Sequence, residues 1–134
     1  MKALLYIAIF LAVALFTGCT KAADTDIAQN GSLVGKWILI ETLADPGDGS
    51  GKWTPVNPPN VDYIQFKEDG SIESNVSGRF SRLKKYSVIN DSTLHFEYGI
   101  GDKVMLYYKL VGKTLTISGG CIEACGSKFI KSGA

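Results

Sequence analysis

The chain has 134 residues, 46% of them hydrophobic, with 14 Lys and Arg against 13 Asp and Glu. This length fits one domain with an appendage, and a charged fraction of 20% is too low for a disordered chain. The net charge of +1 lacks the basic excess that nucleic-acid binding needs, and the single His excludes a multi-histidine metal cluster.

Residues 1–18 have the organisation of a secretory signal peptide. The basic start Met1-Lys2 precedes fourteen uncharged residues, Ala3–Phe16, a run that is too short for a membrane-spanning helix. The run ends in Phe16-Thr17-Gly18-Cys19, which resembles the lipobox of bacterial lipoproteins, although Phe16 stands where Leu is usual. The resemblance implies that Cys19 is lipidated and becomes the mature N-terminus, so that a lipid anchor attaches the protein to a membrane. The alternative is an ordinary secreted protein that is cleaved elsewhere.

The segment that follows, residues 19–32, is polar, Ala-rich and weakly patterned, which predicts a flexible tether. Thr20 rather than Asp follows Cys19. In the Gram-negative lipoproteins that the signal peptide resembles, this feature implies the outer membrane. We therefore expect a cell-envelope protein on either the periplasmic or the outer face of that membrane.

From Lys36 onward, hydrophobic residues alternate with polar ones, which is the period of β-strands. Turn residues such as Asp69-Gly70 separate the alternating runs. Eight strands are predicted, namely Lys36–Leu43, Asp62–Lys67, Ser71–Val76, Lys84–Ile89, Thr93–Tyr98, Lys103–Leu110, Thr114–Ser118 and Ser127–Lys131. Short sequential turns favour an up-and-down order. Residues 33–134 are therefore predicted to form an all-β, eight-stranded antiparallel barrel, which removes exposed edges.

The segment Asp45–Asn60 interrupts this pattern. It holds all four prolines of the chain together with Gly47, Gly49 and Gly51, so no strand is expected in it. A loop of 16 residues inside a compact domain is long enough to be a functional lid or an ordered Ω-loop. The alternative is a solvent-exposed insertion.

Several segments resemble a known family. Gly35-Lys36-Trp37 resembles the Gly-x-Trp signature of lipocalin-like barrels. The rest of the mature chain resembles the small lipocalin-like lipoproteins of Gram-negative bacteria in the segments Ala44–Trp53, Tyr63–Phe66 with Asp69-Gly70, and Cys121–Gly126 leading into Lys128-Phe129. The resemblance implies a lipocalin-like barrel with a ligand-binding role. In larger lipocalins an Arg near the C-terminal end often packs over the signature Trp, whereas the last predicted strand here offers Lys128 and Lys131.

Alternation also predicts which large side chains face the barrel interior. They are Trp37, Leu39, Ile64, Phe66, Ile72, Tyr86, Val88, Leu94, Phe96, Leu106, Tyr108, Leu115, Ile117 and Phe129. A pocket lined in this way suits a small apolar or aromatic ligand. The candidate ligand-binding residues are Trp37, Phe66, Tyr86, Phe96 and Tyr108, with Trp53 from the loop. The alternative is that these side chains fill a narrow barrel, because protein interiors pack to a density of about 0.75.

A second hypothesis assigns the protein to a different class, an envelope interaction module. In this hypothesis the barrel is a filled scaffold, and the Asp45–Asn60 loop contacts a protein or a glycan through an exposed Trp53. The alternative for Trp53 is that it folds back and covers the barrel mouth.

Cys121 and Cys125 are the only thiols that remain if Cys19 is lipidated, and the envelope is an oxidising compartment. A structural disulfide that locks the Gly119–Gly126 connection is therefore predicted. The alternatives are a two-thiol metal clip, which lacks two further ligands, and a redox pair, whose usual spacing is Cys-x-x-Cys.

No catalytic constellation is recognisable in the sequence. His95 lies out of phase with its hydrophobic neighbours, so it is predicted to face solvent, and no nucleophile is paired with it. Neither Gly51-Lys52 nor Gly112-Lys113 completes a phosphate-binding loop, and Asp45 and Asp48 lack the repeat of a calcium loop. We expect a non-enzymatic protein without a cofactor or a metal.

Overall fold

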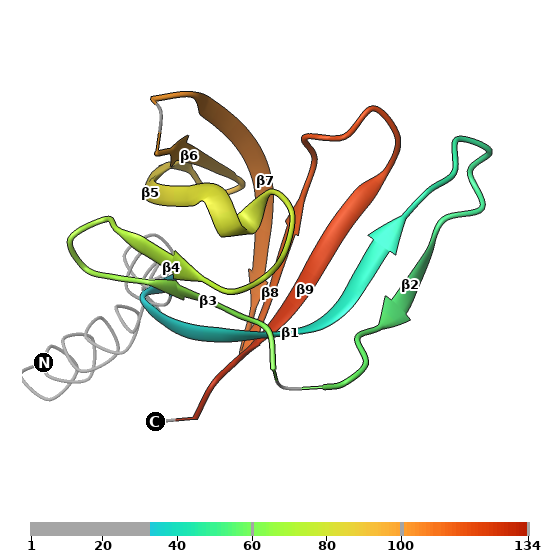
Figure 1. Cartoon of the computed structure of the whole chain (residues 1–134), viewed down its shortest axis with the longest axis horizontal. Helices are drawn as coiled ribbons and strands as arrows, with labels where there is room; N and C mark the ends of the chain where they lie inside the picture. Colours follow the sequence, from blue (N-terminus) through green and yellow to red (C-terminus); the bar gives the residue numbers. More distant parts are fainter. Residues whose placement is uncertain (1–32, 60, 100, 134) are drawn as a thin grey trace, which may run out of the picture.

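A computed structural model describes residues 33–133 of the chain, apart from Asn60 and Ile100. The expected signal peptide, Cys19 and the tether lie outside the described residues. The strands are β1 (Gly35–Ala44), β2 (Lys52–Pro55), β3 (Tyr63–Phe66), β4 (Ile72–Ser74), β5 (Leu83–Asn90), β6 (Thr93–Tyr98), β7 (Lys103–Val111), β8 (Thr114–Ser118) and β9 (Cys125–Lys131), with a 3₁₀ turn, η2 (Phe80–Arg82), before β5 (Figure 1). Among these residues, no helix has the length and the apolar character needed to cross a membrane.

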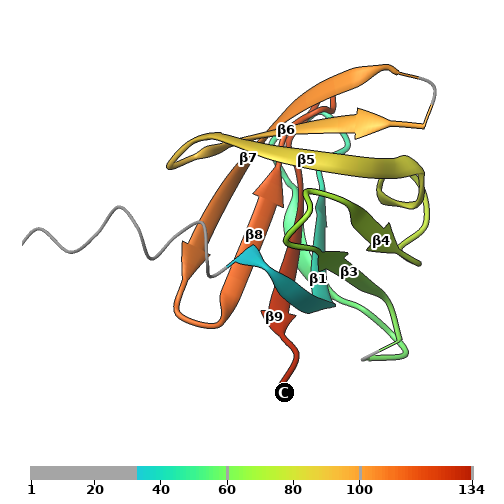
Figure 2. The same cartoon turned by 90° about the vertical axis from the view of Figure 1, so that its left-hand side faces the viewer.

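Eight of the strands form a nearly closed antiparallel barrel. β3 pairs with β4, each strand from β5 to β9 pairs with the next along the chain, and β9 returns to pair with β1, which also pairs with β3. The gap between β4 and β5 is narrowed by a bridge between Ser71 and Lys85 and by the Tyr86 amide, which donates to the Gly70 carbonyl at 2.8 Å (Figure 2). The predicted all-β, up-and-down barrel is confirmed.

The prediction that Asp45–Asn60 contains no strand is wrong. Within it, β2 pairs antiparallel with the second half of β1, so that Trp53 lies opposite Leu43. β3 pairs only with the first half of β1. β2 forms despite the prolines because it is a short edge strand that ends at Pro55, and an edge strand tolerates a residue without an N–H donor.

The core follows the predicted alternation. Of the fourteen side chains assigned to the interior, twelve are buried, and Tyr86 and Val88 are half-buried against them. Four further buried hydrophobic side chains come from outside the predicted inward set, namely Leu33, Val76, Phe80 and Leu83. Leu33 precedes the first strand, Val76 and Phe80 belong to the connection between β4 and β5, and Leu83 begins β5, so they lie at the ends of the barrel strands, where alternation gives little information.

Trp37 closes the end of the barrel at which β1 begins and β9 ends. Its ring is fully buried, and its Nε1–H donates to the Leu33 carbonyl at 2.7 Å. The Lys131 ammonium lies 5.0 Å from the centre of the ring. Gly35, with φ of +125°, admits the Lys131 side chain where a Cβ would lie 3.2 Å from its Cε.

Candidate functional site

The candidate ligand-binding residues inside the barrel lie in a filled core. Trp37, Phe66 and Phe96 are fully buried, and Tyr108 is nearly so. The Phe66 ring packs edge-on against Tyr86 at 4.9 Å between centroids and lies 6.4 Å from Phe96. None of these five residues lines either of the two hollows described here. The structure brings them together as packing partners of one another.

Tyr108 and Tyr86 differ in how their hydroxyls are satisfied. The Tyr86 hydroxyl donates to the Lys67 carbonyl at 3.0 Å. The Tyr108 hydroxyl is buried and has no hydrogen-bond partner among the described residues, and burial raises the pKa of this phenol. A buried hydroxyl without a hydrogen-bond partner makes the folded protein less stable than a phenylalanine ring at the same position would.

Trp53 lies on the outer face of the barrel, near the end at which β1 ends and β9 begins. Its ring covers Gly126, where an added Cβ would lie only 2.8 Å from the Trp53 Cη2 atom. The Lys128 ammonium lies 4.5 Å from the ring centre and also forms an ion pair with Glu41. Trp53 is 37% exposed, so it neither plugs the barrel nor stands free in solvent.

The turn between β1 and β2 is organised by the Asp45 carboxylate. Its Oδ1 accepts from the Gly47 and Gly49 amides at 2.8 and 3.1 Å, and its Oδ2 accepts from the Gly51 amide at 3.0 Å. These bonds, the Gly47 bond foremost, lower the pKa of Asp45. The Asp45 carboxylate therefore stabilises the backbone of this turn. As far as residues 33–133 are described, they contain no group of three metal-ligating side chains.

Cys121 and Cys125 form a disulfide in the β8–β9 connection, with 2.04 Å between their sulfur atoms. The predicted pairing is present in the structure. This connection and the β1–β2 turn rise at the same end of the barrel, which we call the mouth (Figure 1). The Asp45 amide ties the two together, because it donates to the Ala124 carbonyl at 3.0 Å.

Arg79, just before η2, reaches across the mouth to the disulfide loop. Its Nη1 donates to the Gly119 carbonyl and lies 3.8 and 3.6 Å from the sulfur atoms of Cys121 and Cys125. The guanidinium also lies 5.0 Å from the centre of the Phe80 ring. Burial lowers the pKa of this half-buried group.

These elements border the mouth hollow, an open depression of about 370 Å³. Its apolar wall includes Leu39, Val56, Val76 and Phe80, and its polar rim includes Thr42, Asp62, Arg79, Ser127 and the two cysteines. The lining comes from β1, from the segment between β2 and β3, from the connection that runs from Val76 to Phe80, and from the β8–β9 connection with the start of β9. Apolar walls with a few polar groups are typical of small-molecule sites.

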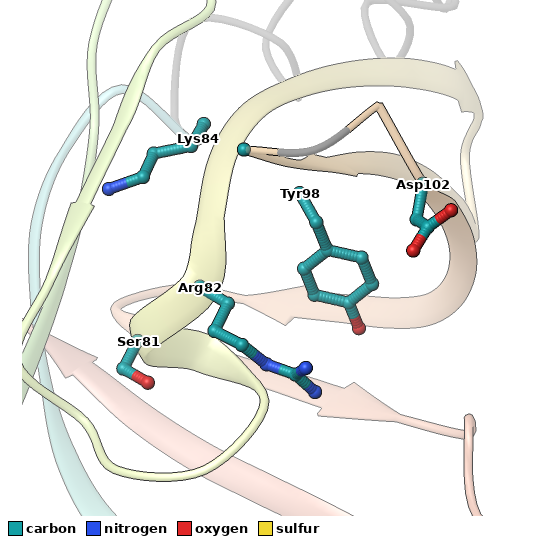
Figure 3. Close-up of a pocket in the computed structure, with 6 residues that line it drawn as sticks. Ser81, Arg82, Lys84, Tyr98 and Asp102 are labelled. Atoms are coloured by element: carbon teal, nitrogen blue, oxygen red, sulfur yellow. The ribbon is translucent and has the colours of Figure 1, made fainter.

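A second depression, the side hollow, has a volume of about 460 Å³ and lies between η2 and the β6–β7 connection. Tyr98 stands between Arg82 and Asp102, while Lys84 points away from it (Figure 3). The Arg82 guanidinium lies 5.2 Å from the centre of the Tyr98 ring. The neighbouring residue of the β6–β7 connection, Ile100, lies outside the described residues.

Sequence reasoning did not identify Arg79 and Asp62 as residues that line the mouth hollow. Arg79 lies in a connection between strands, where no periodicity indicates the direction of a side chain. Asp62 was assigned only to the start of a strand. The one available signal is that Arg79 is directly followed by a large aromatic residue, Phe80, outside any predicted strand.

The chain was compared with protein-family models, with curated proteins and with solved structures, and no match was found. A functional assignment therefore depends on the geometry of the mouth and on the pattern of the N-terminal residues.

Proposed function

We propose that this protein is a non-enzymatic envelope lipoprotein whose lipocalin-like barrel binds a small apolar or aromatic ligand at its mouth. In this proposal residues 1–18 are removed, Cys19 carries the lipid anchor, and residues 19–32 tether the barrel to the outer membrane. Nucleic acid is not a partner.

The mouth hollow is the observation that carries the ligand-binding part of the proposal. Its volume of about 370 Å³ falls within the range of about 300–1,000 Å³ that small-molecule sites occupy. Leu39, Val76 and Phe80 form a wall that is continuous with the filled core. In this proposal the buried aromatic residues, such as Trp37 and Phe96, pack the core of the barrel and do not contact the ligand.

The ligand-binding proposal is tested with the uncharged aromatic dye N-phenyl-1-naphthylamine, whose fluorescence rises in apolar surroundings. We expect saturable binding by the wild-type protein and its loss in Val76→Trp, because the larger ring fills the hollow. Val111→Trp is the matched control, since Val111 is 62% exposed at the end of β7. Equal dye binding by Val76→Trp and the wild type would contradict a site at the mouth.

The lipid-anchor proposal is tested by Cys19→Ala in the native host. Two or three acyl chains hold a protein stably on a membrane, whereas one alone binds only marginally. The variant is therefore expected to leave the membrane fraction, and unchanged fractionation would contradict lipidation at Cys19.

A second candidate function is an interaction module that contacts a protein or a glycan through the Asp45–Asn60 segment. It is favoured by the filled core and by Trp53, which remains 37% exposed beside the mouth. Co-sedimentation with purified peptidoglycan tests the glycan form of this candidate. Retention of the wild-type protein but not of Trp53→Ala, with dye binding intact in both, would support it over the ligand-binding proposal.

A further inference from the structure

Arg79 is the feature of the mouth hollow that an apolar ligand does not explain. Its guanidinium is half-buried at the rim, between the disulfide loop and the Phe80 ring. Taking a cation out of water is unfavourable unless a partner compensates for the lost hydration. The free protein supplies only part of that compensation.

Among the described residues, no ion pair neutralises the charge of Arg79. The ion pairs among the described residues join Lys67 to Glu73, Lys103 to Glu97 and Lys128 to Glu41. Asp62 lines the same hollow but forms no ion pair with Arg79. An anion that enters the hollow would therefore meet the Arg79 guanidinium, which forms no ion pair with any carboxylate of the described residues.

The hydrogen bonds of Arg79 leave donors for such an anion. Every bond that it makes within the described residues uses Nη1, to the Gly119 carbonyl and to the two sulfur atoms. A guanidinium has five N–H donors, and the pair on Nε and Nη2 matches the two oxygens of a carboxylate. The Gly119 bond fixes the orientation of the group, so its remaining edge is already ordered before a ligand binds.

We propose that the ligand of the mouth hollow is an amphipathic monoanion, whose carboxylate-like head binds the Nε–Nη2 edge of Arg79 and whose apolar body lies against Leu39, Val76 and Phe80. This inference rests on the proposed ligand-binding function and specifies the chemical class of the ligand. Asp62 on the same rim disfavours a second negative charge.

The test compares two probes with the same aromatic body, 2-naphthoate and the uncharged 2-naphthamide. Calorimetric titration uses the mature chain from position 19, with Cys19→Ser to avoid the acyl chains. We expect 2-naphthoate to bind at least about tenfold more tightly than 2-naphthamide, because hydrogen bonds to charged groups are stronger than neutral ones.

Arg79→Gln is expected to abolish the preference for 2-naphthoate while leaving the affinity for 2-naphthamide within about twofold, since the apolar wall is unchanged. Arg82→Gln is the matched control, because its guanidinium lies three residues further on, over Tyr98 in the side hollow. Circular dichroism of each variant establishes that it is folded.

Asp62→Asn provides a variant that does not alter Arg79. Loss of this carboxylate removes a repulsive charge from the rim, so the affinity for 2-naphthoate should rise severalfold and that for 2-naphthamide should stay constant. This result would support the inference even if Arg79→Gln failed to fold.

The outcomes separate the inference from the proposed function. Equal binding of the two probes by the wild type, or a preference that survives in folded Arg79→Gln, would overturn the monoanion inference and leave an apolar site in place. If neither probe binds and N-phenyl-1-naphthylamine also fails to bind, the proposed function is contradicted and the inference falls with it.

Discussion

The closed end and the mouth of this barrel are built by different means. At the closed end, Trp37 lies on a regular strand, points inward by alternation and is covered by Leu33. At the mouth, Arg79, the disulfide loop and the β1–β2 turn meet through bonds between irregular segments. At the closed end, the alternation of inward-facing side chains along a strand produces a packed core. At the mouth, hydrogen bonds between the connecting segments hold the structure together and leave a hollow.

The two tryptophans show the same contrast. Trp37 is completely buried, whereas Trp53 is 37% exposed and covers a glycine on the outer face. Substitutions at both ends of the barrel test whether the two ends differ in their contribution to stability.

The largest expected effect is at the closed end. Trp37→Ala should lower the free energy of unfolding by about 3–5 kcal/mol, the usual cost of truncating a large buried aromatic residue. Trp53→Ala should cost about 1 kcal/mol, as is typical of a partly exposed residue. Thermal and denaturant unfolding of both variants side by side measures the difference. If Trp53→Ala were the more damaging, the mouth would be part of the stabilising core.

The disulfide should contribute the next largest effect. Replacing both Cys121 and Cys125 by Ser should cost about 2 kcal/mol, because the bond closes a five-residue loop in the unfolded chain. Ile122→Ser is the control, since Ile122 is fully exposed in the same loop. Mass spectrometry of the protein isolated from its native host should find both thiols protected from alkylation before reduction, and two reactive thiols would contradict the pairing.

Gly126→Ala should cost about 1 kcal/mol, because its Cβ would meet the Trp53 ring at 2.8 Å and the ring must move. In a Trp53→Ala background the same change should cost almost nothing, which a double-mutant cycle measures. Gly133→Ala is the control, since no atom lies within 4 Å of its added Cβ. Equal costs in the two backgrounds would show that the ring does not rest on Gly126.

Within the core, Tyr108→Phe should leave stability unchanged or raise it by up to about 1 kcal/mol, because it removes a buried hydroxyl that has no hydrogen-bond partner among the described residues. Tyr86→Phe is the matched change and should cost about 1 kcal/mol, since it deletes the bond to the Lys67 carbonyl. A clear loss of stability in Tyr108→Phe would indicate that the hydroxyl has a partner in solution.

The smallest effect is expected in the β1–β2 turn at low pH. Because the pKa of Asp45 is lowered in the folded protein, its contribution is fully present above the usual aspartate pKa of about 3.9 and is lost as the pH falls through the lower folded value. The amide resonances of Gly47 and Gly51 should shift with this titration. In Asp45→Ala they should not, and if they titrate there, Asp45 does not organise the turn.

Much of the fold could be predicted because strand alternation is a local property. The strands Thr93–Tyr98 and Thr114–Ser118 were predicted with their observed bounds, and twelve of the fourteen inward residues are buried. β2 was missed because its pairing with β1 depends on the Asp45-centred turn, and a proline-rich segment indicates a loop by composition alone.

The candidate site was less predictable than the fold. The inward direction of the aromatic residues was predicted correctly. Alternation does not distinguish side chains that line a cavity from side chains that fill the core, and Phe66 and Phe96 pack within the core. Arg79 could not be placed, because its position depends on the Gly119 carbonyl, which lies forty residues away in the chain.

The sequence by itself determined the all-β class and the order of the barrel strands, because hydrophobic period and turn chemistry act over a few residues. It favoured a disulfide between Cys121 and Cys125 over a metal clip or a redox pair, and the structure contains that bond. Only the tertiary structure decided that the core is filled, that Trp53 lies on the outer face, and that Arg79 lines a hollow at the mouth. These features depend on the volume between distant strands and on contacts between connections, which no local pattern encodes.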